Sequence, residues 1–382
     1  MDNITKNDRL IWVDITRIIA IIAVVAIHVD DAFIFSWTKI SWTNWWISNV
    51  YSGLIRFPVP LFIILSGYLL LDKQEDDRIF FSKRFSKVVI PLVAWSIIYW
   101  TFTNKYNTFS IFTVDFAQRL LTDTANFHLY SLNIIHVFSI STVDFVQRFL
   151  ADKIYFHLYF LYIILGLYLI TPLLRRILAH ATMYDIRYYL ILWFFFSPVS
   201  QLLGLFKYNI GIPVEAATGS LGLYIFGYAV KKTRITNKII YLSVVLIAVS
   251  VIVTIFGTYI LTSKSGRYDQ SFTGWLSITS VIYAACLFVW IREVFGRFSM
   301  TGIWSRCGKV LRVIGGASMG IYLVHPMLLH FVFTGISGVH LLSATVLNPL
   351  FSVPLVTFLL VVSSLVIVLF LQKTPLLRMI VP

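Results

Sequence analysis

Long apolar stretches alternate with short polar segments along the whole chain. A helix of about 17–25 predominantly apolar residues is long enough to cross a bilayer. Ten such stretches can be counted, at 11–29, 50–71, 86–103, 155–174, 188–206, 213–230, 238–261, 273–291, 310–334 and 350–372. The pattern therefore predicts an all-α, polytopic membrane protein with about ten transmembrane helices.

The composition supports this prediction. Hydrophobic residues make up 58% of the 382 residues and charged residues only 13%, whereas soluble domains have about 45–50% apolar and about 25% charged residues. A soluble fold of this length could not bury so much apolar surface. The two cysteines, Cys286 and Cys307, imply no disulfide framework.

Basic residues between the stretches predict the orientation, because Lys and Arg favour cytoplasmic connections. With the N-terminus inside, twenty-one of the 31 basic residues fall in cytoplasmic segments and eight in external ones. The remaining two, Arg17 and Arg56, lie within predicted helices. We therefore expect both termini in the cytoplasm and a multi-pass protein of the inner (cytoplasmic) membrane. The net charge of +14 reflects this asymmetry and gives no indication of nucleic-acid binding.

An external segment between the third and fourth predicted helices contains a direct repeat. The sequence at 109–135 recurs at 138–164, which aligns His128 with His157. Two copies are too few for a solenoid, so we interpret them as a tandem duplication in a loop that tolerates insertion. Only the second copy continues into a full apolar run, which favours His157 as the functional histidine. The chain is otherwise treated as one membrane domain, 1–382, carrying this duplicated segment at 109–164.

The first predicted helix contains an arginine and a histidine, Arg17 and His28. Eleven residues at 100° each end about 20° past three full turns, so the two side chains share one face about 16 Å apart. Ionisable groups inside a bilayer are costly and by default indicate function. Asp14, three residues before Arg17, can pair with it, although this pair could also be a simple packing contact.

Expected depth in the membrane separates the other ionisable residues. His28 lies at the external end of the first helix, Arg56 in the outer third of the second, His157 at the outer mouth of the fourth and His325 near the middle of the ninth. We therefore expect histidines and an arginine to converge in the external half, with Arg17 toward the cytoplasm. The alternative for a histidine at a helix end is a place in the polar interface.

Five motifs occur in order along the chain: WVDITRIIAIIAVVAIH with its R-x10-H spacing, IRFPVPLFIILSGYLL at 55–70, FSKRFSKVVIP at 81–91, FHLYFLYIILGLYLITPLL at 156–174 and GASMGIYLVHPMLLH at 316–330. Together they resemble the family-3 membrane acyltransferases, most closely the branch of surface-glycan O-acetyltransferases that acts on glycans such as enterobacterial common antigen. The motifs cover both ends of the chain, while about 180–310 is supported by hydropathy alone.

This resemblance implies transfer of an acyl group, usually acetyl from cytoplasmic acetyl-CoA, to a hydroxyl of a glycan or lipid-linked saccharide across the membrane. It also implies that the arginine and histidine of the first helix are required. The family's R-x-x-R pattern, associated with the CoA donor, corresponds here to Arg84-x-x-Lys87 preceded by Lys83, and lysine lacks the bidentate fork of arginine. A second departure is Tyr159, where the family pattern has tryptophan.

General chemistry agrees with that implication. A sugar hydroxyl needs a base that titrates near neutrality, as imidazole does. Our hypothesis is that His28 deprotonates the acceptor hydroxyl, or first takes the acyl group itself, while Arg56 stabilises the oxyanion. Arg17 is too distant for that role and is assigned to the donor's pantetheine or phosphate end, with Asp14 orienting it.

The acceptor side is assigned to His157, Tyr159 and His325. Acyl-CoA, the saccharide acceptor and membrane lipid are the expected partners; neither a metal nor a nucleic acid is expected. An exporter or flippase of a glycan or lipid is the alternative function, with the same charged residues lining a pathway. The inverted repeats that transporters often show are not evident in this sequence. A structural membrane protein is a third possibility.

Overall fold

A computed structural model of the chain describes residues 11–103, 142–208, 210, 219–296, 303–334 and 348–382. It divides into two compact units: the first comprises Met1–Asp77 and Leu167–Pro382, and the second Arg78–Gly166. Every regular element among the described residues is a helix, which confirms the all-α class. The principal elements are α1 (Ile11–Ile34), α2 (Trp42–Ile55), α3 (Pro58–Leu70), α4 (Asp77–Thr103), α8 (Tyr159–His180), α9 (Met183–Phe194), η2 (Phe195–Val199), α10 (Ser200–Leu205), α11 (Leu221–Lys232), α12 (Asn237–Ser265), α13 (Ile278–Phe295), α14 (Ile303–Gly316), α15 (Ser318–Thr334), α16 (Pro349–Leu371) and α17 (Pro375–Arg378).

Nine of the ten predicted membrane segments coincide with apolar helices of sufficient length. Among the described residues, eight helices qualify, and a ninth is obtained when the pair Cys307–Gly316 and Ser318–Phe331, bent by 60°, is taken as one span. The predicted segment 213–230 differs. Only α11 is described there, and its 12 residues extend about 18 Å, well short of the roughly 30 Å hydrocarbon core.

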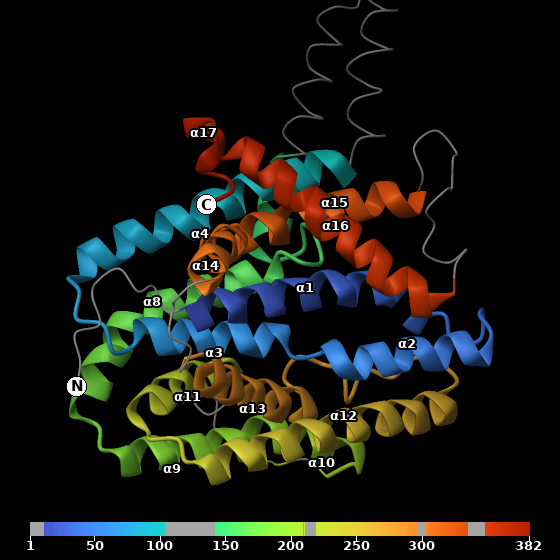
Figure 1. Cartoon of the computed structure of the whole chain (residues 1–382), viewed down its shortest axis with the longest axis horizontal. Coiled ribbons are helices and arrows are strands. Elements are labelled where there is room, and N and C mark those ends of the chain that lie inside the picture. The colour runs from blue at the N-terminus through green and yellow to red at the C-terminus, as the bar shows by residue number, and fades with distance from the viewer. Residues whose placement is uncertain (1–10, 104–141, 209, 211–218, 297–302, 335–347) are drawn as a thin grey trace, which may run out of the picture. The chain divides into compact units, whose positions relative to one another are not determined.

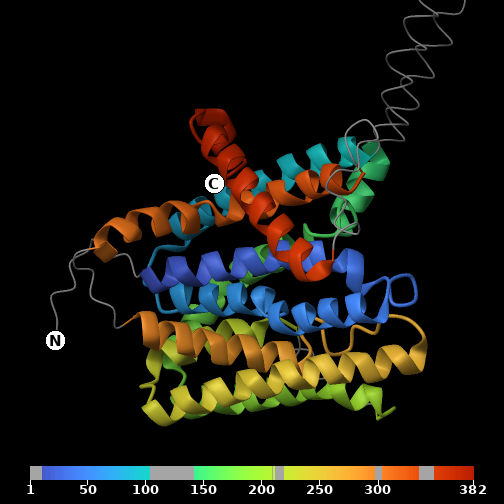
Figure 2. The same ribbon diagram turned by 45° about the vertical axis from the view of Figure 1, so that its right-hand side comes forward.

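Helix α1 lies inside the first unit. Figures 1 and 2 both show it between α14, α15 and α16 on one side and α2 and α3 on the other, with α11 and α13 beyond α3 and then α9 and α12. Its residues Ala20, Ile21, Val25 and Val29 have no exposed surface. Because neighbouring helices cover α1, its ionisable side chains meet protein partners.

The second predicted segment is broken into two helices. Pro58 is the first residue of α3 and has no N–H to donate to the carbonyl of Leu54 one turn earlier. The hydroxyl of Tyr283 on α13 donates to that carbonyl instead, at 3.0 Å. The break places Arg56 at the C-cap of α2. The predicted segment 50–71 thus belongs to one candidate span, Trp42–Leu70, whose helix is interrupted at Arg56 because Pro58 cannot continue the backbone hydrogen bonding.

Within the second unit, α4 is followed by a helical stretch at 142–150 and the start of α8. The first copy of the sequence repeat, including His128, lies outside the described residues. In the second copy, Arg148 pairs with Asp144 at 2.7 Å and the hydroxyl of Tyr162 donates to the carbonyl of Phe149 at 2.6 Å. The second copy thus forms local tertiary contacts of its own.

Candidate functional site

We call the cluster of His28, Asp31 and Arg56 the outer site, after its predicted depth in the membrane. The carboxylate of Asp31 joins His28 to Arg56. Asp31 Oδ2 lies 3.4 Å from His28 Nδ1, and Asp31 Oδ1 lies 3.2 Å from Arg56 Nη2. Asp31 stands one turn after His28 on α1, whereas Arg56 reaches the site from the break between α2 and α3. The side chains of His28, Arg56 and Asp31 are 16%, 14% and 30% exposed, so the three groups meet where water is only partly excluded.

Arg56 is held by further partners. Its Nε donates to Ser52 Oγ at 3.0 Å, and its Nη2 also lies 3.4 Å from the hydroxyl of Tyr268. That hydroxyl contacts Thr273 Oγ1 at 2.8 Å, and Phe35 packs edge-on against the Tyr268 ring. Burial raises the pKa of Tyr268, which therefore remains a neutral phenol. Tyr268 belongs to the connection between α12 and α13, so the guanidinium is fixed from three directions.

His325 joins the outer site from α15. Its ring stacks on that of His28 with centroids 5.4 Å apart and planes inclined by 20°. His325 is fully buried, and its Nδ1 lies 3.0 Å from the carbonyl of Ile321. A carbonyl can only accept, so Nδ1 carries the proton in this contact. His28, Arg56 and His325 thus lie together, although the sequence placed His325 only near mid-depth, and their roles stay predictions.

A second carboxylate, Asp30, ties α1 to α2 beside the outer site. It is fully buried and accepts a hydrogen bond of 2.6 Å from Ser48 Oγ. Because successive residues on a helix point in different directions, Asp30 and Asp31 serve different neighbours. Asp30 anchors the helix pair, and Asp31 joins the ionisable side chains.

We call the pair of Asp14 and Arg17, at the other end of α1, the inner site. Arg17 Nη1 is 3.3 Å from Asp14 Oδ1, as the spacing of three residues predicted. Asp14 is buried against α14, where a β-carbon added at Gly315 would lie 2.9 Å from the Asp14 Cβ. The Arg17 side chain remains 30% exposed. Eleven residues of continuous helix separate Arg17 from His28, about 16 Å, so the two act at different sites.

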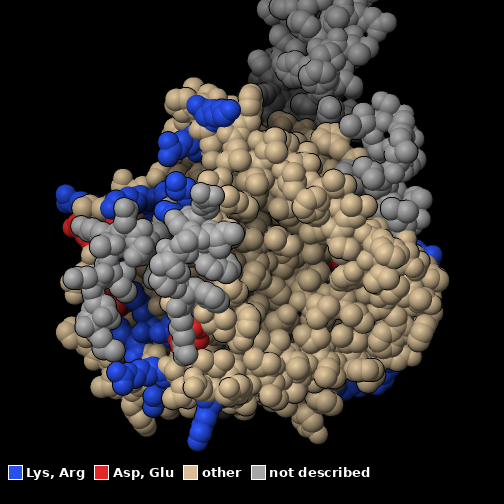
Figure 3. Space-filling model, viewed as in Figure 1, with Lys and Arg blue, Asp and Glu red and all other residues tan. Residues whose placement is uncertain are grey.

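Aromatic and basic side chains surround the inner end. The ring of Tyr68 packs edge-on against Trp12 at 5.0 Å, while Lys231 and Arg292 lie over it at 5.6 and 5.8 Å. Such cation–π contacts are favourable where water is partly excluded. Figure 3 shows basic side chains gathered toward the side where α1 begins and α3 ends, with a broad uncharged surface elsewhere on the visible face of the first unit. This end of the unit is suited to an anionic ligand.

The remaining predicted site residues belong to the second unit. His157 is 1% exposed, and its ring lies edge-on against Tyr99 at 4.8 Å and Tyr155 at 5.4 Å. Tyr159 is half-buried at the start of α8. On α4, Arg84 is half-buried, and Lys83 and Lys87 are exposed. Within the second unit, aromatic rings thus enclose His157, and the basic residues of α4 are accessible to solvent.

Sequence reasoning missed Asp31 and Tyr268. Asp31 carries a usable signal, since it follows His28 by three residues and continues the same helix face. It was passed over because the helix was expected to end at residue 29, whereas α1 continues to Ile34. Tyr268 carries no such signal: it follows the left-handed Gly266 in a polar connection, and only the tertiary fold brings it to Arg56.

The arrangement of a histidine, a carboxylate and an arginine can provide a base, its orienting partner and a cation for a developing oxyanion. Comparison with known proteins identifies the family. The chain matches the family model for the acyltransferase domain of type 3 over residues 10–372. It therefore belongs to the acyltransferase-3 family and is a multi-pass membrane acyltransferase.

No curated protein and no solved structure matches the chain. Among the described residues, no group of three or more His, Cys, Asp or Glu side chains is arranged to hold a metal ion.

Proposed function

We propose that this acyltransferase moves an acetyl or other short acyl group from cytoplasmic acyl-CoA to a hydroxyl of an extracytoplasmic glycan or glycolipid. The observation that carries the proposal is the contact of Asp31 with both His28 and Arg56. Within a membrane acyltransferase, this trio supplies the functional groups that O-acylation needs. The R-x10-H spacing on α1 supports the same assignment.

His28 acts as the base. The carboxylate of Asp31 beside Nδ1 favours the tautomer with its proton on Nδ1, so Nε2 is the unprotonated nitrogen that accepts the hydroxyl proton. The acceptor oxygen then attacks the thioester carbon, the carbonyl oxygen becomes an oxyanion, and the C–S bond breaks as it collapses. The departing CoA thiolate takes up the proton from the imidazolium. An acyl group carried first on Nε2 is the alternative route.

Arg56 stabilises the oxyanion. A guanidinium has five N–H donors, and the contacts to Asp31, Ser52 and Tyr268 involve only Nε and Nη2. The two N–H groups of Nη1 have no hydrogen-bond partner among the described residues and can face the substrate. Asp31 holds the guanidinium before the reaction begins, which is the preorganisation that makes such donors effective.

The donor is assigned to the basic residues toward the cytoplasm. Arg17, oriented by Asp14, binds the pantetheine or phosphate end of acetyl-CoA, and Lys83, Arg84 and Lys87 bind its other phosphates. His157, Tyr159 and His325 are assigned to the acceptor. In this scheme the protein resides in the inner membrane, and the placement of both termini in the cytoplasm requires that the segment 213–230 crosses the bilayer as well, as the sequence predicts.

The test compares His28→Ala with His330→Ala, an exposed histidine on the same helix as His325. A strain lacking the protein is complemented with each variant, and alkali-labile ester on its surface glycans is measured. We expect His28→Ala to lower ester formation by about 10²–10⁴-fold, while His330→Ala retains it. Purified His28→Ala should still bind acetyl-CoA with wild-type affinity, which separates lost chemistry from lost folding.

Undiminished ester formation by His28→Ala would end the assignment of the base. A change in the amount of glycan at the surface, with its ester content per sugar unaltered, would favour an exporter instead.

A further inference from the structure

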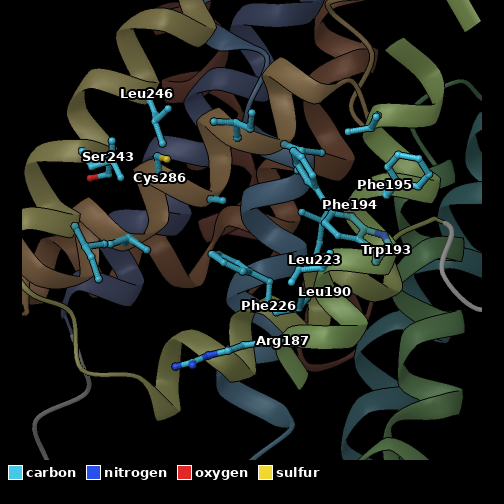
Figure 4. Close-up of a pocket in the computed structure, with 18 residues that line it drawn as sticks. Arg187, Leu190, Trp193, Phe194, Phe195, Leu223, Phe226, Ser243, Leu246 and Cys286 are labelled. Atoms are coloured by element: carbon cyan, nitrogen blue, oxygen red, sulfur yellow. The ribbon is translucent and has the colours of Figure 1, made fainter. Parts of the chain in front are cut away.

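An apolar groove lies in the first unit between α9 with η2 and the helices α11, α12 and α13 (Figure 4). Its volume is about 690 Å³, within the range of pockets that hold small ligands. Only Arg187, Ser243 and Cys286 interrupt a lining of aliphatic and aromatic side chains. The hydroxyl of Ser243 already donates to the carbonyl of Ile240 at 2.7 Å. The body of the groove therefore suits a hydrocarbon chain.

A π-helical turn forms part of the groove wall. Element η2 contains Pro198, which cannot donate a backbone hydrogen bond. Phe195 and Val199, at the two ends of this turn, both line the groove. Single π-helical turns inside α-helices occur frequently at functional sites, so the wall is shaped by a local departure from regular helix.

The length of the groove matches one leaflet of a bilayer. Along α9 and η2 it extends from Arg187 to Val199, twelve residues or about 18 Å. Half of a hydrocarbon core of roughly 30 Å is about 15 Å. A single lipid chain lying along the groove would reach from the membrane surface to about the midplane.

One end of the groove is cationic. Figure 4 shows Arg187 at that end, away from Leu246, Ser243 and Cys286. Arg187 is exposed, and the described residues provide no carboxylate within ion-pair distance of it. Exposed Lys238 directly precedes Ile239, which also lines the groove. A basic rim beside an apolar channel complements a ligand with an anionic head and a hydrocarbon tail.

We propose that this groove binds an anionic phospholipid of the surrounding bilayer, with its phosphate at Arg187 and one acyl chain between α9 and α12. Under the predicted topology Arg187 faces the cytoplasm, which selects an inner-leaflet lipid over a lipid-linked saccharide whose sugar lies outside. The bound lipid fills the space beside α11, whose 12 residues extend about 18 Å.

The test uses native mass spectrometry of the full-length purified protein titrated with phosphatidylglycerol or phosphatidylcholine. We expect discrete phosphatidylglycerol adducts, weakened about tenfold by Arg187→Gln because a charge-assisted contact to phosphate is lost. Arg267→Gln removes an equally exposed arginine away from the groove and should leave the adducts unchanged. If the wild type and both variants form equal adducts with both lipids, the groove is filled adventitiously only, and the proposal is overturned.

A second measurement reports from inside the groove. In a Cys307→Ser background, Cys286 is the remaining thiol, and a membrane-permeant maleimide labels it. We expect phosphatidylglycerol to slow labelling at least several-fold relative to phosphatidylcholine, and Arg187→Gln to abolish the difference. Labelling rates that do not depend on lipid head group would place the lipid elsewhere and refute the assignment. Size-exclusion profiles verify that each variant is folded.

Discussion

The two ends of α1 hold their charges in different ways. At the outer end, Asp31 joins His28 to an arginine from another part of the chain, and the stacked His325 comes from a third helix. At the inner end, Arg17 pairs with Asp14 one turn away on the same helix and remains partly exposed. The outer site therefore depends on tertiary packing, whereas the inner pair depends mainly on helix geometry.

This difference sets the expected sizes of mutational effects. Removing one partner from a largely buried charge pair leaves the other charge desolvated, which is costly. At the inner end the carboxylate of Asp14 is buried but the Arg17 side chain is 30% exposed, and an i, i+3 pair that water reaches contributes only about 0.2–0.5 kcal/mol. The outer end should therefore respond strongly in both catalysis and stability, and the inner end should respond mainly in donor binding.

The largest effect is expected from Asp31→Asn. The amide keeps the size of the carboxylate but cannot stabilise an imidazolium or neutralise Arg56. We expect kcat to fall by about 10²–10⁴-fold and the free energy of unfolding to fall by about 1.5–3 kcal/mol. Turnover assays and thermal denaturation provide the measurements. Asp269→Asn is the matched control, because Asp269 directly follows Tyr268 in the chain and its carboxylate accepts a hydrogen bond from the backbone N–H of Ser271. Equal losses in both variants would contradict a specific role for Asp31.

Arg56 offers the second test, through two substitutions. Arg56→Gln removes the cation and should lower kcat by about 10²–10³-fold, as loss of one oxyanion donor does. Arg56→Lys restores the charge without the planar fork and should recover only part of that loss. If lysine restores full activity, charge alone matters and the geometry around Nη1 is irrelevant.

A smaller effect is expected at the inner end. Arg17→Gln should raise the KM for acyl-CoA by about tenfold, equivalent to about 1.4 kcal/mol, and leave kcat within a few-fold of wild type. Steady-state kinetics with varied donor concentration separate the two parameters. A fall in kcat at unchanged KM would place Arg17 at the chemistry and abolish the contrast between the two ends.

Features that depend on local periodicity could be predicted from the sequence. Apolar runs located nine of the ten expected membrane segments, and the spacing of Asp14 and Arg17 predicted their pairing. Features that depend on breaks in this periodicity could not be predicted from the sequence. Pro58 signalled an interruption at Arg56, yet the compensating hydroxyl of Tyr283 comes from 229 residues away. Asp31 lay just beyond a helix end that was placed too early.

The candidate site shows the same division. Depth within the predicted helices placed His28 and Arg56 in the same half of the bundle and His325 near its middle. It could not show which side chains touch, because rotation of each helix is set by packing against its neighbours. The spacing of Asp31 from His28 could have indicated their contact, whereas its contact with Arg56 and that of the Tyr268 hydroxyl required the tertiary structure.

The smallest effect is expected from Asp72, just beyond α3 near the inner end, which contacts Lys232 at 2.5 Å and Lys231 at 3.3 Å. Partial burial acts to raise the pKa of Asp72, but hydrogen bonds from the two lysines outweigh it and lower the pKa below 3.8. The carboxylate therefore stabilises the fold above pH 3.8, and this contribution is lost as the pH falls through the lowered value.

Because the contact of Asp72 with the two lysines is partly solvated, we expect Asp72→Asn to reduce the free energy of unfolding at pH 7 by only about 0.2–1 kcal/mol. Denaturation of both proteins at low and high salt provides the measurement. If the two proteins still differ in free energy of unfolding below the folded pKa of Asp72, or if the difference does not depend on salt, Asp72 acts through packing rather than through its charge.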